Sequence, residues 1–482
     1  MSESSTSAPL PEPPEPAARP GFWASVREAI AGSGQDFTQG PIGRAVLLLA
    51  IPMVLEMSME SLFGIVDVYF VAALGEDAVA TVGLTESLLT ILFALAIGLS
   101  MSTTAIVARR TGEKDPEGAA RTAAQAITIG IALSAAIAVV GVAFAPGLLR
   151  AMGAEESLVA TGTTYTRVML GGNVTIFLLF LLNAVFRGVG DAAIAMRVLW
   201  ISNAINIVLD PCLIRGIGPF PEMGLTGAAV ATNIGRGIGV FFQFWVLFRA
   251  RGRIGLARRH FALQPKEMLT LVKVSIGGIL QFLVATASWL GLVRILALFG
   301  SAALAGYTIA IRIIIVALLP AWGLSNAAAT LVGQSLGAKD PARAEKAVWI
   351  TAFYNMGFLA VVAAAFILVP EAIISIFVRG EIDPEVLPIG VACLRYVSYG
   401  YVFYALGMVL VQAFNGAGDT MTPTFINLGC YWLFQIPVAY TLAKPLALGP
   451  TGVFVAITIA ESLIAIVGLV VFRRGRWKTR RV

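Results

Sequence analysis

The sequence predicts an all-α membrane protein with twelve transmembrane helices, arranged as two six-helix lobes that are related by an internal repeat. Three observations predict this fold. The 482 residues are 58% hydrophobic and only 13% charged, with a mean hydropathy of +0.84, which is far more apolar than an ordinary soluble domain. Long apolar segments recur at close to the roughly 20 residues that a helix needs to cross a bilayer. Motifs of the first half also return in the second.

The predicted spans form two groups of six. Their approximate bounds are 45–73, 79–107, 121–145, 160–184, 192–214 and 225–248, then 268–298, 302–333, 345–369, 389–414, 422–443 and 451–472. We expect an N-terminal lobe over 41–248, a basic linker over 249–267, a C-terminal lobe over 268–473 and a basic tail over 474–482. Residues 1–40 should form a disordered or interfacial segment, with a short surface helix that includes Phe22, Trp23, Val26 and Ile30.

The repeat is visible in four pairs of motifs that occur in the same order. Gly75 matches Gly300, and the GEKDP motif that begins at Gly112 matches the GAKDP motif that begins at Gly337, both with an offset of 225. RGVGD and NGAGD match with an offset of 228, and two Thr-Gly pairs match with an offset of 225. An even number of helices in each half gives both halves the same orientation. A binding site is then expected between the lobes, as in other transporters with parallel repeats.

The pI of about 9.3 does not indicate nucleic acid, because the basic residues lie in alternate loops. The loops predicted to be cytoplasmic hold Arg109, Arg110, Lys114, Arg121, Arg187, Arg197, Arg249, Arg251, Arg253, Arg258, Arg259, Lys266, Lys339, Arg343 and Lys346. The loops predicted to lie outside hold little beyond Arg150, Arg215, Arg379 and Lys444. This asymmetry predicts an inner (plasma) membrane protein with both termini in the cytoplasm.

Three carboxylates lie in the first predicted span. Glu56, Glu60 and Asp67 are spaced by four and seven residues, which places them along one helical face. A charge at the centre of a membrane helix costs roughly 2.5–3.5 kcal/mol, so these acids should face a cavity, pair with a cation or carry a proton. Structural ion pairs with Arg236, Arg294 or Arg312 are the alternative. In the same helix, Pro52 predicts a kink that would act as a hinge.

A second polar face occurs in the fifth span. Asn203, Asn206 and Asp210 are spaced by three and four residues and precede Pro211. Their oxygens, with the hydroxyl of Thr232 from the next span, are the ligand type that a hard cation such as Na⁺ prefers. The C-terminal half offers only Glu461 as a deep acid, so ion coupling is expected in the N-terminal lobe.

The sequence does not indicate an enzyme. It contains no P-loop, zinc-ligand or nucleophile-elbow motif at workable spacing. The lone His260 lies in the basic linker and is expected to be a solvated loop residue. Without a nucleotide site or another cofactor, transport should be driven by H⁺ or Na⁺.

Residues 40–475 resemble the multidrug and toxic compound extrusion (MATE) exporters. The resemblance rests on IVDVYFVAALG with Asp67, on the IVARRTGEKDP and LVGQSLGAKDP motifs, on FRGVGD and on NIVLDP. Within that family the chain is similar to the DinF-type branch. The resemblance implies alternating access of two lobes, with Asp67, Asn206, Asp210 and Thr232 as residues that couple H⁺ or Na⁺ entry to export of a small, often cationic, organic molecule.

Two other transport functions compete with this interpretation. A flippase for an amphiphilic lipid-linked substrate would share the two-lobed fold, and Arg294 and Arg312 are compatible with an anionic headgroup. A sugar or nutrient facilitator is disfavoured, because the loop ARRTGEKDPEGAAR lacks the Asp-Arg-x-Gly-Arg pattern of that family. The expected partners are thus small organic molecules and the lipid bilayer, and the protein is expected to be a monomer.

Overall fold

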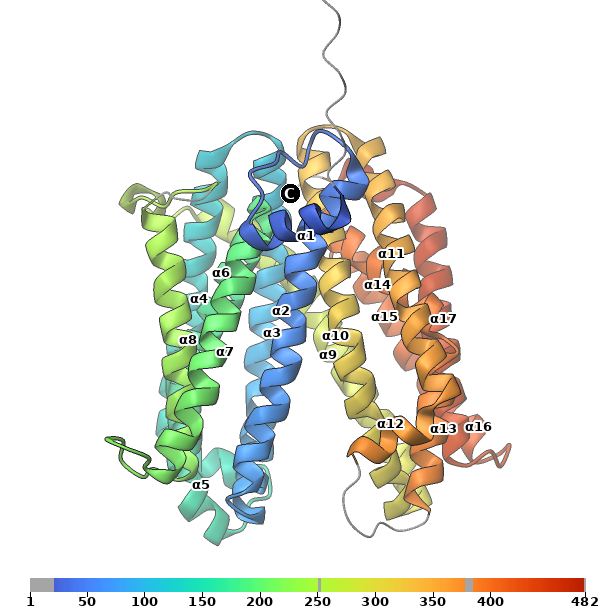
Figure 1. Ribbon diagram of the computed structural model, residues 1–482. Helices are drawn as coiled ribbons and strands as arrows, with labels where there is room; N and C mark the ends of the chain where they lie inside the picture. The colour runs from blue at the N-terminus through green and yellow to red at the C-terminus, as the bar shows by residue number, and fades with distance from the viewer. Residues whose placement is uncertain (1–20, 250–252, 378–384, 481–482) are drawn as a thin grey trace, which may run out of the picture.

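The computed structural model describes residues 21–249, 253–377 and 385–480. Over these residues the chain is helical, and no β-strand occurs among them. Figure 1 shows two bundles of long helices that meet beside α1 (Phe22–Ala31) and diverge toward the opposite end. The predicted all-α membrane fold with two lobes is confirmed, and so is the predicted helix at Phe22 to Ile30. Of the segment 1–40 that is predicted to be disordered or interfacial, residues 1–20 lie outside the described residues.

Each lobe contains six helical passages, and several of them are divided. The N-terminal lobe comprises α2 (Ile42–Ala72), α3 (Glu76–Gly112), α4 (Pro116–Ala151), α5 (Glu156–Gly171), α6 (Asn173–Val189), α7 (Ala192–Arg215) and α8 (Leu225–Phe248). The C-terminal lobe comprises α9 (Pro265–Leu296), α10 (Ser301–Gly337), α11 (Pro341–Leu368), α12 (Pro370–Phe377), α13 (Val386–Ser398), α14 (Tyr401–Gly416), α15 (Met421–Asn427), the π-helix η3 (Leu428–Gln435), α16 (Ile436–Ala443) and α17 (Pro450–Arg473). The short helix η1 (Arg258–Phe261) lies in the linker between the lobes.

Nine helices in the described part of the chain are long and apolar enough to cross a membrane, and the bent pair α13 and α14 makes a tenth. Two further passages are less regular. Asn233 and Arg236 interrupt the apolar sequence of α8, and the passage over 421–443 contains the π-helix η3. With these two, the described residues supply the twelve passages that hydropathy predicts.

One predicted span is wrong in detail: the span predicted at 389–414 is broken where α13 meets α14, and the two helices are bent by 58°. The span predicted at 160–184 lies within Glu156–Val189, which counts as one span although α5 and α6 are separated at a single residue. Gly400 and Gly172 lie at the two breaks. Glycine favours a break because it has no Cβ and keeps more backbone freedom than other residues.

The internal repeat is present in the backbone as well as in the sequence. Gly75 and Gly300 precede α3 and α10 with φ values of 101° and 93°, a region that favours glycine. Asp115 and Asp340 precede α4 and α11, and each side chain accepts a hydrogen bond from the backbone N–H three residues later, at 2.8 and 2.9 Å. These aspartates cap the helix N-termini, with proline at the first helical position. The KDP motif therefore builds the same turn in both lobes.

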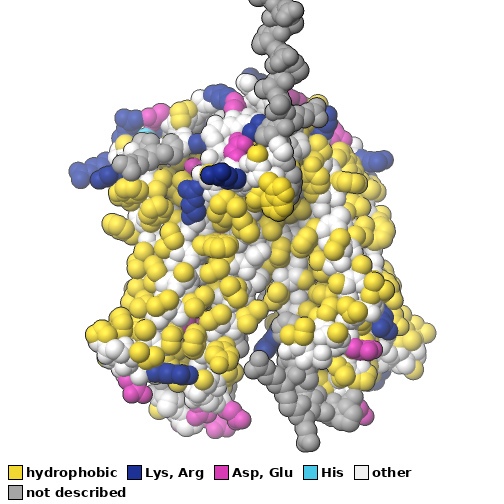
Figure 2. Space-filling view, in the orientation of Figure 1, with side chains coloured by type: hydrophobic (Ala, Val, Ile, Leu, Met, Phe, Trp, Pro, Cys, Tyr) yellow, Lys and Arg dark blue, Asp and Glu magenta, His cyan; other side chains and the backbone are white. Residues whose placement is uncertain are grey.

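The end of the molecule that carries α1 also carries most of the basic side chains. We call it the basic end, and it includes Lys114, Arg253, Arg343 and Arg473. We call the opposite end the far end, and it includes the turns at Gly75 and Gly300. Figure 2 shows Lys and Arg gathered mainly at the basic end of the visible face, while hydrophobic side chains cover the middle of both lobes. In the same view the surface is hollowed between the lobes toward the far end.

Close backbone contacts between α3 and α10 join the lobes at the basic end. A Cβ atom on Gly112 would lie 2.0 Å from the carbonyl oxygen of Gln334, and one on Gly337 would lie 2.1 Å from that of Arg109. The side-chain amide of Gln334 also donates to the carbonyl of Gly188 at 2.9 Å. Only glycine leaves room for this approach, as at other close helix crossings in membranes.

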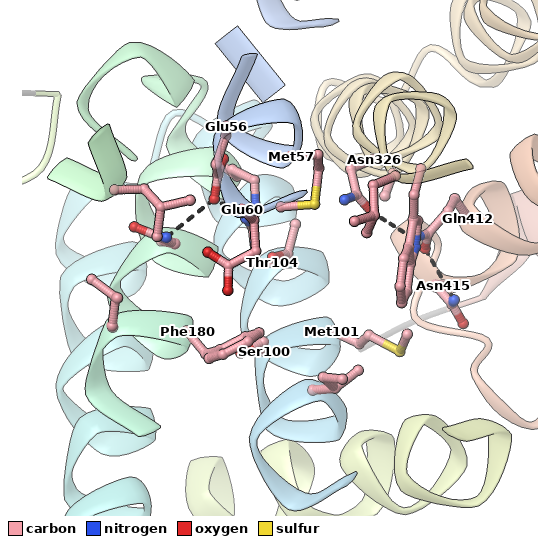
Figure 3. A pocket seen from close by; sticks show the side chains of 18 of the residues that line it. Glu56, Met57, Glu60, Ser100, Met101, Thr104, Phe180, Asn326, Gln412 and Asn415 are labelled. Carbon is pink, nitrogen blue, oxygen red and sulfur yellow. Dashed lines mark hydrogen bonds and ion pairs between the residues drawn. The ribbon is translucent and has the colours of Figure 1, made fainter. Parts of the chain in front are cut away.

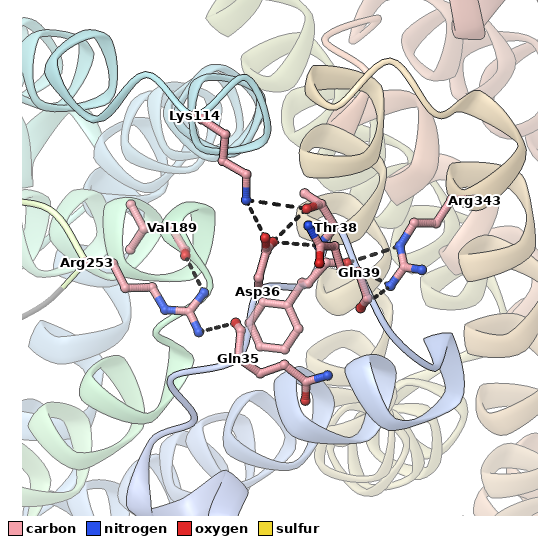
Figure 4. Close-up of polar contacts among 9 residues, drawn as sticks. Gln35, Asp36, Thr38, Gln39, Lys114, Val189, Arg253 and Arg343 are labelled. Atoms are coloured by element: carbon pink, nitrogen blue, oxygen red, sulfur yellow. Dashed lines mark hydrogen bonds and ion pairs between the residues drawn. The ribbon is translucent and has the colours of Figure 1, made fainter. Parts of the chain in front are cut away.

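Residues 33–40 form a strap across the basic end (Figure 4). On the side of the N-terminal lobe, Lys114 donates to Asp36, and Arg253 donates to a strap carbonyl at 2.7 Å. On the side of the C-terminal lobe, Arg343 donates to three strap carbonyls at 2.9–3.1 Å. Burial alone would raise the pKa of Asp36, but hydrogen bonds from Lys114 and from the strap lower it to about 2. The strap thus binds both lobes.

The prediction that His260 is a solvated loop residue is wrong. Its side chain is buried in η1, and its Nε2 lies 2.7 Å from a carboxylate oxygen of Glu117 on α4. Gln125, also on α4, donates to the carbonyls of His260 and Ala262 at 2.9 Å. The linker therefore packs on α4, a tertiary contact that no local sequence pattern indicates.

Candidate substrate and ion site

A cavity of about 240 Å³ lies between the two lobes. Figure 3 shows Glu60 and Met57 of α2 on one side of this central cavity, and Gln412 and Asn415 of α14 on the other. The described residues that line it include Glu56, Met57, Glu60, Ser100, Met101, Thr104, Phe180, Asn183, Arg187 and Arg236 from the N-terminal lobe, and Phe282, Leu319, Trp322, Asn326, Gln412 and Asn415 from the C-terminal lobe. Its wall thus combines apolar side chains with polar and charged groups from both lobes, a mixture that suits a site for small organic molecules.

Glu56 forms a buried ion pair at this cavity. The guanidinium of Arg187 on α6 donates to its carboxylate at 2.8 Å, and the two side chains are 13% and 1% exposed. Asn183 donates to the same oxygen at 3.1 Å, and Gln243 on α8 donates to Asn183 at 2.6 Å. This chain of hydrogen bonds positions one carboxylate oxygen of Glu56, which thereby links α2 to α6.

Glu60, one turn further along α2, is held more loosely. Its carboxylate lies 3.9 Å from the guanidinium of Arg236 on α8 and 3.5 Å from the side-chain amide of Asn203 on α7. Arg236 also lies over the ring of Phe63 at 5.8 Å. Glu60 is partly exposed to the cavity, whereas Asn203 is buried. The structure therefore brings together Glu60 and Asn203, two of the predicted site residues.

Asn206, Asp210 and Thr232 form a compact polar cluster between α7 and α8. With the Asn206 amide oriented to suit its neighbours, its NH₂ group donates to Asp210 at 2.8 Å, and its oxygen accepts from the Thr232 hydroxyl at 3.1 Å. All three side chains are buried. The predicted spacing of Asn206 and Asp210 does place them on one face of α7, and Thr232 adds its hydroxyl from α8 as expected.

Asp67 approaches this cluster from α2. It lies close enough to Arg236 and to Asp210 for their charges to interact, but it is not among the described residues that line the central cavity. Glu86 of α3 and Tyr165 of α5 lie within the same electrostatic range, and the sequence analysis missed both. The three acids of α2 therefore have different charged or polar neighbours along the helix.

Pro52 lies inside α2, which remains helical on both sides of it. The carbonyl of the next residue, Met53, contacts α10 so closely that a Cβ atom on Gly323 would lie 2.5 Å from it. Pro52 is thus placed where the N-terminal lobe touches the C-terminal lobe. Its role as a hinge stays a prediction.

Na⁺ prefers oxygen ligands, and this region offers them from Asp210, Asn206, Thr232 and Asp67. The two carboxylates could instead hold a proton. No group of three or more His, Cys, Asp or Glu side chains suited to a metal ion occurs within the described residues. A cation in the cluster would therefore depend on amide and hydroxyl oxygens.

Arg187 was expected in a cytoplasmic loop, and that expectation is wrong. Helix α6 continues to Val189, so Arg187 lies in its last turn and reaches into the cavity. The ion pair of an α2 acid with Arg236, considered as an alternative, is confirmed for Glu60. Arg294 and Arg312 form no ion pair with these acids in the described structure, and Glu56 instead pairs with Arg187. The glycine three residues after Arg187 was the available signal for a helix end.

Comparison with known proteins decides the family. The MatE family model matches residues 52–212 and 278–441, one stretch in each lobe. The chain belongs to the MatE family. A protein of Thermotoga maritima that is named "probable multidrug resistance protein NorM" is 28% identical over 450 residues, covering 92% of this chain and 94% of the relative.

Solved structures of MATE transporters share the fold. A crystal structure of a MATE protein in complex with MaL6 is 26% identical, with a TM-score of 0.87 over 92% of this chain and 99% of that one. A MATE transporter described in an outward-facing conformation is 27% identical, with a TM-score of 0.86 over 93% of this chain and 99% of that one. The MatE protein described here is therefore a membrane transporter, and the predicted MATE resemblance is confirmed.

Proposed function

We propose that this protein exports small, often cationic, organic molecules in exchange for H⁺ or Na⁺. One observation supports the proposal most directly. The central cavity and the buried polar cluster are separate, but they lie side by side and residues of α2, α7 and α8 contribute to both. Relatives named as multidrug resistance proteins support export as the direction of transport.

The coupling ion would bind at Asp67 and Asp210, with Asn206 and Thr232 as neighbours. A cation there reduces the repulsion between the two carboxylates, whose charges interact. Since Asn203 on α7 also contacts Glu60 on α2, a change in the packing of α2 and α7 is transmitted to the cavity wall. Bending at Pro52 would accommodate this movement.

The basic end would face the cytoplasm of a cell whose inner membrane holds the protein, in line with the excess of Lys and Arg at that end. The described conformation, with lobes joined at the basic end and divergent at the far end, would then be the one that releases substrate outside. The DinF-type branch and the monomeric state stay predictions.

A lipid flippase receives less support. A carrier of anionic headgroups needs a strongly basic cavity, yet Arg187 and Arg236, the two basic residues of the described cavity wall, each lie beside a glutamate. Arg294 and Arg312, which favoured that function, are exposed and do not line the central cavity as described.

The test is efflux of ethidium from proteoliposomes with an imposed pH or sodium gradient. We expect efflux under one of these gradients, and a loss of at least about tenfold in Asp67→Asn and in Asp210→Asn, since neither amide can exchange a proton or carry a negative charge. Asp77→Asn, at an exposed site on α3, is the matched control and should transport normally.

Undiminished efflux in both Asp67→Asn and Asp210→Asn would refute coupling at these acids. No efflux by correctly inserted wild-type protein under either gradient would favour the flippase.

A further inference from the structure

A second cavity of about 300 Å³ adjoins the central one on the side of the C-terminal lobe. The two share wall residues from both lobes, including Met101, Phe282, Leu319, Trp322 and Gln412. The space between the lobes therefore continues into the C-terminal lobe, where its wall also includes Gln281, Tyr404, Met408, Asn427, Tyr431 and Glu461.

Glu461 is the acid of this second cavity. It projects from α17 and accepts a hydrogen bond from the hydroxyl of Tyr431 at 3.0 Å. Tyr431 belongs to the π-helix η3, a geometry that is frequent at functional sites. None of the ion pairs in the described part of the chain includes Glu461. An acid at membrane depth without a basic neighbour needs a proton or a cation from elsewhere.

The internal repeat shows what has changed at this position. With the offset of 225, Glu461 on α17 corresponds to Arg236 on α8, and Ala285 on α9 corresponds to Glu60 on α2. The N-terminal lobe therefore holds a glutamate and an arginine 3.9 Å apart. At the equivalent positions the C-terminal lobe has a methyl group and a carboxylate, and both line the second cavity. Cavity space and one negative charge replace the ion pair.

We propose that the second cavity binds the organic cation that this transporter carries, with the positive charge of the ligand beside Glu461. The inference rests on the proposed export function and deepens it by locating the charge of the substrate. Phe282, Trp322 and Tyr404 would contact the apolar body of the ligand, because aromatic faces attract organic cations and pack against their substituents.

The division of charges between the lobes supports an organic ligand at this place. Glu56 and Glu60 both lie beside arginines, so Glu461 is the carboxylate without a basic partner among the described residues that line the two joined cavities. Apart from Glu461, the side-chain oxygens of the wall belong to neutral groups, the hydroxyls of Tyr404 and Tyr431 and the amides of Gln281, Gln412, Asn415 and Asn427. Aromatic and aliphatic side chains form much of the rest, so the wall suits an organic cation with one positive charge better than a bare metal ion. The coupling ion would thus bind in the N-terminal lobe, and the positive charge of the substrate would bind in the C-terminal lobe.

Binding of tetraphenylphosphonium to the purified full-length protein in nanodiscs tests the proposal. We expect Glu461→Gln to raise the dissociation constant at least about tenfold, because the amide keeps the size of the side chain but loses its charge. Glu461→Asp keeps the charge and should recover most of the affinity. Glu371→Gln, an exposed position on α12, is the matched control. Triphenylphosphine oxide, which is neutral, should bind all four proteins with similar affinity.

An unchanged tetraphenylphosphonium affinity in Glu461→Gln would overturn the proposal. Equal loss of tetraphenylphosphonium and of triphenylphosphine oxide binding would also overturn it, since that result would indicate a general structural defect rather than a lost charge. Failure of the proposed function has a different signature. It would appear as absent gradient-driven ethidium efflux by the wild-type protein, whereas the binding experiment requires no gradient.

Discussion

The buried pair of Glu56 and Arg187 should make a large contribution to stability that depends on both members. In Arg187→Met the carboxylate of Glu56, which is only 1% exposed, loses its cation. Removing one partner of a buried pair typically costs about 3–5 kcal/mol. We therefore expect a clearly lower unfolding temperature for Arg187→Met in detergent micelles, and a substantial recovery when Glu56→Gln is added.

The double variant is the informative control, because the amide introduced by Glu56→Gln would be neutral and could still accept the hydrogen bond from Asn183. If Arg187→Met alone unfolded like the wild type, the pair would not stabilise the lobe.

The sequence could predict the acids of α2, since their spacing is local. It could not predict their partners, because the position of Arg187 depends on where α6 ends and on the tertiary arrangement that brings its side chain to Glu56.

At the scale of elements, the strap over residues 33–40 should depend on Arg343. This side chain donates to three strap carbonyls from α11, so Arg343→Ala removes the described hydrogen bonds between the C-terminal lobe and the strap. We expect hydrogen exchange of residues 33–40 to become faster by about tenfold or more, as lost protection raises local opening. Lys346→Ala, an exposed position on the same helix, should leave exchange unchanged, and equal exchange in both variants would contradict the role of Arg343.

The contact between Asp36 and Lys114 gives the strap a defined pH dependence. The pKa of Asp36 is about 2 in the folded protein and 3.8 for the unperturbed side chain. A lowered pKa stabilises the folded state above the unperturbed value and loses this effect as the pH falls through the folded value. Exchange of residues 33–40, corrected for the intrinsic pH effect, should therefore be constant from about pH 5 to 8 and increase between about pH 4 and 2. In Asp36→Asn that increase should be absent, and its persistence would assign the effect to another group.

Helix type and order could be predicted from hydropathy, but the irregular elements could not. The π-helix η3 and α14, which follows the bend, both contribute to the wall of the second cavity. Such features depend on tertiary contacts, whereas a hydropathy window averages over about 19 residues. Glu461 was visible as the deep acid of the C-terminal half, yet its aromatic neighbours come from α14 and η3, far from it in sequence.

At the scale of the whole molecule, the sequence predicts two lobes but not which end is closed, because alternating-access states use the same helices. Gly112 and Gly337 allow the close approach of α3 and α10 at the basic end, where the two bundles meet in Figure 1. In Gly337→Val the added side chain would collide with the backbone of α3, since even a Cβ atom lies 2.1 Å from the Arg109 carbonyl. Overpacking typically costs about 1–3 kcal/mol, which changes the ratio of two states by roughly 5- to 150-fold.

We therefore expect Gly337→Val to favour a conformation that is open at the basic end and closed at the far end. Spin labels at exposed Ser157 and Leu446 would report this as a shorter distance between the lobes at the far end, in protein without Cys212, Cys393 and Cys430. Gly357→Val is the matched control, because a Cβ atom at that helical glycine meets nothing within 4 Å. If the two variants and the wild type gave the same distance distribution, the glycine contacts would not set the conformation. A shift in Gly337→Val alone would show that the close approach of α3 and α10 at Gly337 holds the basic end closed.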